Sequence, residues 1–196
     1  MMADIQTAFQ ITTAGNQAIS TADGKQQLRA DYAADADEAE IDNMIKAATL
    51  QVEAYTSRKC MPTVMEFYLT DFPIGGIVLP FSPVSVVTSI TYYDGDNALQ
   101  TWAGTNYFSS IYEEPCRIRY VASAPGVYPY RFDAVKVTFT CGYSAADAIP
   151  KSLRQAILVK MADFYEARTD APREKFSNWQ QVCYPDRVVH DLNENK

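Results

Sequence analysis

Two long stretches of the chain place apolar residues at helical spacing. The first covers about residues 37–58, and its apolar face consists of Ile41, Met44, Ile45, Ala48, Val52 and Tyr55. The charged residues Lys46, Glu53 and Arg58 lie off this face, and Pro62 prevents the helix from continuing. This pattern predicts an amphipathic helix that buries one face.

The second stretch covers about residues 150–168 and has the same character. Its apolar face consists of Leu153, Ala156, Ile157, Met161, Phe164 and Tyr165. Pro150 stands where the helix would begin, at a position whose backbone N–H has no intrahelical partner to lose. We therefore expect a second helix that docks on the core.

Between these helices, over about residues 63–140, apolar and polar residues alternate, which is the period of a half-buried strand. The strand-like runs lie near residues 65–69, 77–79, 84–93, 99–102, 107–111, 117–121 and 135–140. Asp94-Gly95 separates two of these runs and is a strong hairpin signal. The region predicts a small antiparallel sheet or sandwich.

The N-terminal part has weaker patterns. Phe9 and Ile11 indicate a short strand or arm, and Ser20 or Thr21 could cap a short helix that ends near Leu28. Gly24 weakens that helix by about 1 kcal/mol relative to alanine.

Together these elements predict an α+β fold in one domain, residues 1–170. The domain would comprise a helical part at 20–60, a β-rich insertion at 61–146 and a helix at 147–170. An extended C-terminal arm, residues 171–196, would follow it.

The composition is that of a folded protein, with 47% hydrophobic and 21% charged residues among 196. No apolar run approaches the roughly 18 residues of a membrane span, and the start lacks a signal-peptide pattern, so we expect no membrane partner. The net charge of −7 argues against a protein that grips DNA phosphates. It is compatible with a surface along which DNA passes without specific binding.

The sequence offers little catalytic chemistry. His190 is the single histidine, and the motifs G-x-S-x-G, GxxxxGK[ST] and GxGxxG are absent. The four cysteines are scattered without C-x-x-C spacing, which is typical of reduced thiols rather than metal ligands. We therefore expect no catalytic residue, no cofactor and no metal site.

Two groups of residues are candidates for interaction. The acidic group, which could be a solvated helix start or line a channel or ring interface, is Asp35, Asp37, Glu38, Glu40 and Asp42. The C-terminal group, which could fold back on its own domain or bind a partner, is Trp179, Val182, Tyr184, Pro185, Arg187 and Val188.

Several short motifs occur in a fixed order along the chain. They are Val52-Glu53-Ala54-Tyr55-Thr56-Ser57-Arg58, Ile77-Val78-Leu79-Pro80, Pro83-Val84-Ser85-Val86-Val87, Ile90-Thr91-Tyr92-Tyr93-Asp94, Cys141-Gly142-Tyr143, Ile149-Pro150, Phe164-Tyr165-Glu166-Ala167-Arg168 and Val182-Cys183-Tyr184-Pro185-Asp186-Arg187-Val188. In this order they resemble the head-tail connector (adaptor) family of tailed phages, from about residue 20 to 189. Cys183 and Asp186 depart from the family pattern, and residues 1–19 have no counterpart.

The resemblance implies a structural protein of the virion neck, assembled in the host cytoplasm. It implies a homo-oligomeric ring of about twelve copies, built on a heterologous interface. The ring would bind the portal protein through the C-terminal arm, prolong the DNA channel, and offer a platform to a stopper or tail-completion protein.

A different class of function stays open at this stage. Eight of the 13 tyrosines lie in or next to the β region, and they could form a binding face. The alternative is therefore a β-rich binding module or a small hydrolase that uses a Tyr-rich face, although core or rim packing explains the tyrosines more simply.

Overall fold

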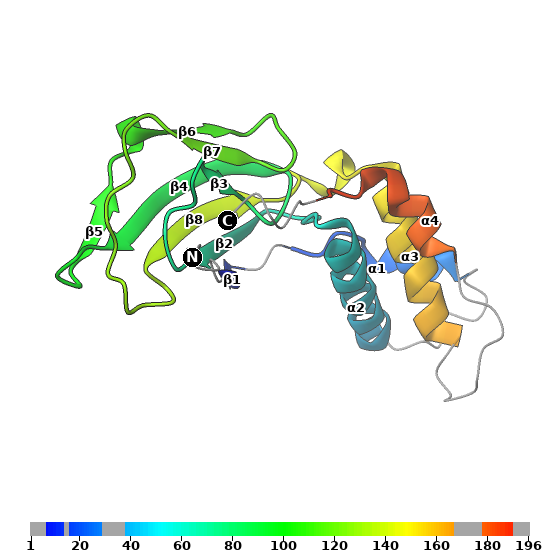
Figure 1. Cartoon of the computed structure of the whole chain (residues 1–196). Coiled ribbons are helices and arrows are strands. Elements are labelled where there is room, and N and C mark those ends of the chain that lie inside the picture. The colour runs from blue at the N-terminus through cyan, green and yellow to red at the C-terminus, as the bar shows by residue number, and fades with distance from the viewer. Residues whose placement is uncertain (1–6, 14–15, 29–37, 167–177, 190–196) are drawn as a thin grey trace. The chain divides into compact units, whose positions relative to one another are not determined.

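The computed structural model describes residues 7–13, 16–28, 38–166 and 178–189 (Figure 1). The chain forms two compact units, a β unit (Met1–Gly15, Pro62–Gly142 and Val188–Lys196) and a helical unit (Asn16–Met61 and Tyr143–Arg187). Helices and antiparallel sheets are both present, so the predicted α+β class is confirmed. The division into a domain at 1–170 and an arm at 171–196 stays a prediction.

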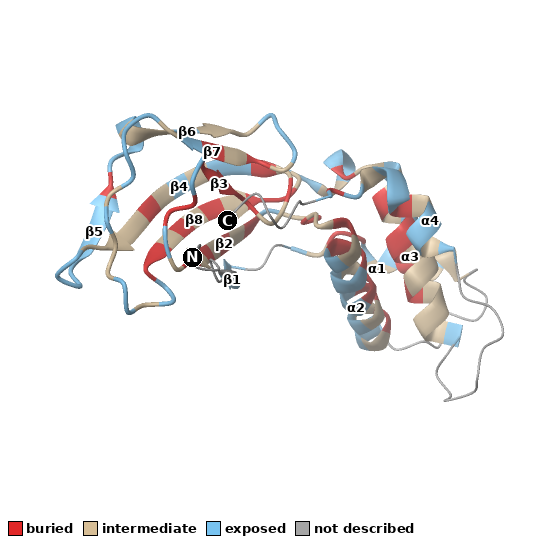
Figure 2. Cartoon of the chain, viewed as in Figure 1, coloured by how far each residue is buried: buried red, intermediate tan, exposed pale blue. Residues whose placement is uncertain are grey.

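In its described residues, the helical unit contains four helices, α1 (Thr21–Gln27), α2 (Glu38–Thr56), α3 (Lys151–Glu166) and α4 (Trp179–Cys183). The two predicted amphipathic helices are α2 and α3. Their buried faces share one core with Ala18 and Ile19, and Figure 2 shows these faces as interrupted red stripes. The fully buried apolar residues of the two helices are Ile41, Ile45, Ala48, Val52, Leu153, Ala156, Ile157 and Met161.

Local signals explain where these helices begin. Ser20 caps α1, because its hydroxyl accepts the N–H of Asp23 at 3.1 Å. Pro150 immediately precedes α3, and its carbonyl accepts the N–H of Arg154 at 3.1 Å. Gly24 lies against α2, where a Cβ would stand 2.9 Å from Ile45 Cδ1, so its lack of a side chain permits the close approach of α1.

The part of the β unit that the structure describes contains two antiparallel sheets. The five-stranded sheet has the order β1-β2-β8-β4-β5, and the three-stranded sheet has the order β3-β7-β6. The strands are β1 (Thr7–Thr13), β2 (Thr63–Leu69), β3 (Ile77–Val78), β4 (Val84–Tyr93), β5 (Leu99–Trp102), β6 (Tyr107–Ser110), β7 (Arg117–Tyr120) and β8 (Val135–Cys141).

The two sheets enclose a single core, so the β unit is a small sandwich. A sandwich is one of the two forms that the sequence predicts for this region. Met65, Phe67 and Leu69 of β2 alternate inward with partly buried residues, and β8 repeats the pattern. Aromatic rings fill one end of the core, where Phe72 lies 4.9 Å from Trp102 between ring centroids.

The C-terminal part differs from the extended arm that the sequence predicts. In residues 178–189, Trp179–Cys183 form the helix α4, and Tyr184–Asp186 form a 3₁₀ turn. The physical reason is that positions 179, 182 and 183 share one helix face and pack on the helical core.

Candidate interaction surfaces

The C-terminal segment, residues 178–187, folds back onto the helical unit. Cys183 is fully buried in the helical core, and Trp179 meets the ring of Tyr55 edge-on, with 5.4 Å between ring centroids. The Lys160 ammonium lies 5.8 Å from the centroid of the Trp179 ring. This end of the segment is therefore held by apolar and aromatic contacts.

Polar contacts hold the other end of the same segment. The carbonyl oxygen of Asp186 accepts the Arg58 Nε–H at 2.5 Å, and its carboxylate accepts the Ser152 hydroxyl. The Arg187 guanidinium lies 5.3 Å from the centroid of the Tyr55 ring. Of the predicted portal-binding residues, Trp179 and Val182 are half-buried, Val188 is buried, and Tyr184, Pro185 and Arg187 are exposed.

The acidic group is only partly within the described residues, because Asp35 and Asp37 lie outside them. Glu38 pairs with Lys25 at 2.6 Å, and Asp42 accepts the Thr21 hydroxyl at 2.5 Å and the Gln17 amide at 3.3 Å. The Thr21 hydrogen bond holds the pKa of Asp42 below its usual value. Two of these acids, Glu38 and Asp42, thus connect α1 to the start of α2. Glu40 is half-buried, and the channel or ring-interface role of the acidic group stays a prediction.

A buried ion pair joins Glu53, in the last turn of α2, to Lys59, just beyond the helix. The sequence did not predict this pair. The sequence pattern places Glu53 off the apolar face, yet its side chain is buried. Its Oε2 atom accepts a hydrogen bond from Lys59 Nζ at 2.8 Å. Its second oxygen accepts the Cys60 N–H at 2.8 Å. Burial raises the pKa of the Cys60 thiol to about 12. The pair therefore closes the end of α2 and has the geometry of a structural contact.

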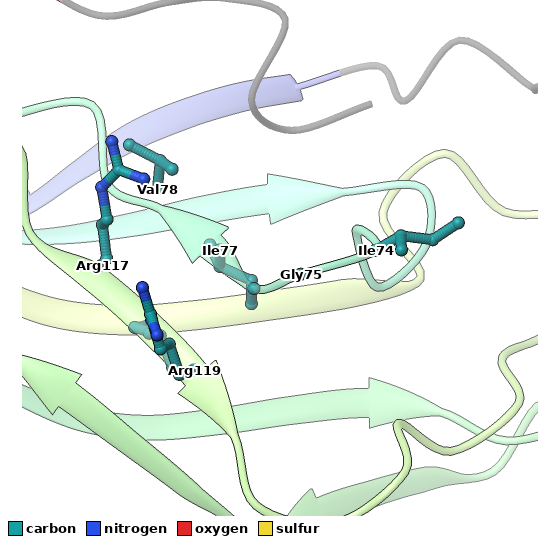
Figure 3. A pocket seen from close by; sticks show the side chains of 8 residues that line it. Ile74, Gly75, Ile77, Val78, Arg117 and Arg119 are labelled. Carbon is teal, nitrogen blue, oxygen red and sulfur yellow. The ribbon is translucent and has the colours of Figure 1, made fainter.

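The β unit has a shallow hollow of about 220 Å³ between the turn before β3 and strand β7 (Figure 3). Arg117 and Arg119 lie beside Ile77 on one face of β7, which makes this a basic spot on an acidic chain. Gly76 has a φ of 121°, and a Cβ there would stand 2.3 Å from the carbonyl oxygen of Ile118. Glycine is therefore required at Gly76 for the turn to lie against β7.

Two other hollows of the β unit are also surface features. One of about 450 Å³ lies beyond the same two arginines and is lined by Phe108 and Tyr112. Another of about 200 Å³ is bordered by Tyr68 and Lys136, both of which hydrogen-bond to Glu66. The Tyr68 hydrogen bond, followed by that of Lys136, lowers the pKa of Glu66. These side chains form ion pairs and hydrogen bonds with one another.

The eight tyrosines do not form one face. Six of them are half-buried, namely Tyr92, Tyr93, Tyr107, Tyr120, Tyr128 and Tyr143, whereas Tyr112 and Tyr130 are exposed. Tyr143 belongs to the helical unit, where its hydroxyl lies 3.1 Å from Arg58 Nη1. The distribution matches the packing explanation, and it removes the main support for the Tyr-rich binding face.

Within residues 7–13, 16–28, 38–166 and 178–189, no group of three or more His, Cys, Asp or Glu side chains could hold a metal ion. No helix in the same part of the chain is long and apolar enough to cross a membrane. The described residues therefore form an α+β chain of two units, each with its own packed core.

Comparison with known proteins identifies this fold. No protein-family model matches the chain, and no curated protein does. Among the solved structures that match, three are similar over 96% of the chain. A chain in the neck of an empty gene transfer agent (GTA) particle, computed with C6 symmetry, is 23% identical, with a TM-score of 0.80 over 100% of its length.

The other two come from native GTA particles. A chain in the virion is 22% identical, with a TM-score of 0.80 over 99% of its length. A chain in the neck, computed with C12 symmetry, is 21% identical, with a TM-score of 0.76 over 100% of its length. The protein therefore has the fold of chains found in the neck of GTA particles.

Proposed function

We propose that this protein is a structural subunit of a phage-like particle neck, a head-tail connector that joins head to tail. It acts by assembly and catalyses no reaction. The observation that carries the proposal is that its fold matches two neck chains over 96% of its own length and 100% of theirs. Both units are included in that match, so the whole chain has the form of a neck component.

The proposed assembly is a closed homo-oligomeric ring of about twelve copies. The C6 and C12 symmetries of the similar neck structures support rotational symmetry here. The net charge of −7 per copy supports a conduit, because an acidic ring repels the phosphates of DNA that passes through it. The ring would sit beneath the portal, extend its channel, and present its other side to a stopper or tail-completion protein.

The contact with the portal protein is assigned to the exposed side of the C-terminal segment. Tyr184 is 64% exposed although its neighbour Cys183 is buried, so the helical core presents an aromatic side chain outward. Pro185 and Arg187 lie beside it and are also exposed. Twelve linked copies of a small contact would give the ring a high avidity for the portal.

Native mass spectrometry of the full chain, alone and with its portal, tests this proposal. We expect a closed ring on the portal, and Tyr184→Ser should weaken its docking. The matched control is Tyr112→Ser in the β unit, because Tyr112 is 94% exposed and makes no part of the proposed contact. Equal docking of both variants would contradict the assignment of the C-terminal segment, and a chain that ignores the portal would contradict the function.

A further inference from the structure

Strand β1 is seven residues long, yet most of its side chains are exposed to solvent. All six residues from Ala8 to Thr13 are exposed, including Phe9 at 55% and Ile11 at 41%. Its partner in the sheet is β2, and the Phe9 ring also meets the Phe81 ring with 5.1 Å between centroids. Among the described strands β1 pairs with β2 alone, so its other edge has no strand partner there, and two large apolar side chains are exposed.

Within the described residues, the outer edge of β1 has few of the features that normally protect a sheet edge. Its sequence, TAFQITT, contains no charged residue and no proline. Its register with β2 is regular from Thr7 to Ile11 and shifts once before Thr13. Edge strands that must stay solvent-exposed usually carry lysine, proline or a bulge, so an uncharged and mostly regular edge is suited to pairing with another strand.

The opposite end of the same sheet has a second edge of this kind. Strand β5, with the sequence LQTW, pairs with β4 and is also free of charge and proline. Leu99 is 60% exposed at its start. The four pairings that lead from β1 to β5 are all antiparallel, so the two edge strands run in the same direction.

These two edges have the properties that a closed ring requires. A head-to-tail ring joins two different surfaces of each copy, and the two ends of one sheet are such surfaces. Copies that each carry a net charge of −7 repel one another, and they can approach most easily where the facing strands carry no charge.

We propose that β1 of one copy pairs in parallel with β5 of the next copy, so that the five-stranded sheet continues from subunit to subunit. The occupant of each open edge is thus a second copy of this chain. The inference rests on the proposed ring, and it goes further by naming the strands that build the interface.

Cross-linking between single-cysteine variants of the full chain tests the pairing. Gln10→Cys in β1 is mixed with Thr101→Cys in β5, the portal is added, and a short bis-maleimide is applied. The four native cysteines are buried, so they give little background. Because each variant carries one introduced thiol, a mixed product can arise only between copies.

Two further variants serve as controls. Thr88→Cys lies exposed on the interior strand β4 and should give no product with Gln10→Cys, whereas Ser109→Cys reports pairing with the edge strand β6. We also expect the double variant Gln10→Lys with Thr12→Lys to reduce the ring to less than about a tenth of its wild-type amount, since edge lysines block strand pairing. Thr88→Lys should leave the ring intact.

A product between Gln10→Cys and Thr101→Cys, together with ring loss in the lysine variant, would support the inference. Rings without that product, rings that tolerate both lysines, or a product with Ser109→Cys would overturn it and leave the proposed neck function standing. A wild-type chain that forms no ring even on the portal would overturn the proposed function, and the strand pairing with it.

Discussion

The helical unit and the β unit complete their structures in different ways. The helical unit uses its own C-terminal segment to finish its core, since Cys183 is buried there and Asp186 bonds to Arg58 and Ser152. The β unit encloses a core between two sheets, and among its described strands the uncharged β1 and β5 end the five-stranded sheet without a further strand partner. One chain therefore contains a unit that satisfies itself and a unit whose edges are suited to neighbouring copies.

This difference changes where association is expected. The apolar cluster near the C-terminus is the natural candidate from the sequence, but two of its side chains, Trp179 and Val182, pack on the helical core. The strand edges, by contrast, cannot be recognised in the sequence. A strand that pairs with another copy and a strand that pairs within its own chain can both be free of charged residues.

The largest effect is expected at the buried ion pair of the helical unit. Glu53→Ala should lower the free energy of unfolding by about 3–5 kcal/mol, because it leaves the Lys59 ammonium buried without this carboxylate and the Cys60 N–H without its acceptor. Urea unfolding measures the change.

The control for this pair replaces both charges. The double variant Glu53→Leu with Lys59→Met should be much closer to wild type than Glu53→Ala, since no charge is left buried. A Glu53→Ala protein as stable as the wild type would show that the end of α2 is not closed by this pair.

The next effect concerns the apolar core on which α3 docks. Leu153→Ala should cost about 2–5 kcal/mol, because it removes a fully buried side chain. Leu50→Ala on the exposed face of α2 is the matched control and should change stability by less than about 0.5 kcal/mol. Similar thermal melts for the two variants would refute the helical core described above.

A smaller effect would sharpen the contrast between the units. Trp179→Ala should cost about 1.5 kcal/mol, since it removes the edge-on contact with Tyr55 that holds the C-terminal segment. It should also expose Cys183, whose pKa is raised by burial to about 11 in the intact protein. Maleimide labelling at neutral pH, read by mass spectrometry, measures this exposure.

Cys116 provides the internal control for that labelling. It lies in the core of the β unit, and burial raises its pKa to about 11 as well. Cys116 should stay unlabelled in Trp179→Ala while Cys183 reacts. If Cys116 and Cys183 were equally resistant to maleimide in Trp179→Ala, Trp179 would not be what keeps Cys183 buried.

The smallest effect is expected at the helix cap of α1. Ser20→Ala should cost about 1 kcal/mol, because the N–H of Asp23 loses its acceptor. Ser20→Asn keeps a capping oxygen and should restore most of the stability. If Ser20→Asn were as destabilised as Ser20→Ala under chemical denaturation, the cap would not explain the start of α1.

The sequence predicted individual elements well, because period and capping are local signals. The faces of α2 and α3 and the alternation of β2 and β8 follow directly from residue spacing, and the sequence narrows the cap of α1 to Ser20 or Thr21, of which the structure has Ser20. Sheet order could not be predicted, since β8 pairs with both β2 and β4 across long stretches of chain.

The candidate sites were harder to predict for a different reason. Glu53 was placed off the apolar face as a charged residue, yet Lys59, just past the helix end, allows it to be buried. The apolar positions at 179, 182 and 183 have helical spacing, but five residues are too few to separate a docking helix from a binding arm by period alone. Portal binding and the lining of a channel stay predictions.

Electron microscopy of the purified full chain bound to its portal tests the central claim most directly. The account predicts closed rings with rotational symmetry seated on the portal, each subunit contributing both of its units. A chain that remains a monomer at every concentration, both alone and in the presence of the portal, would contradict it.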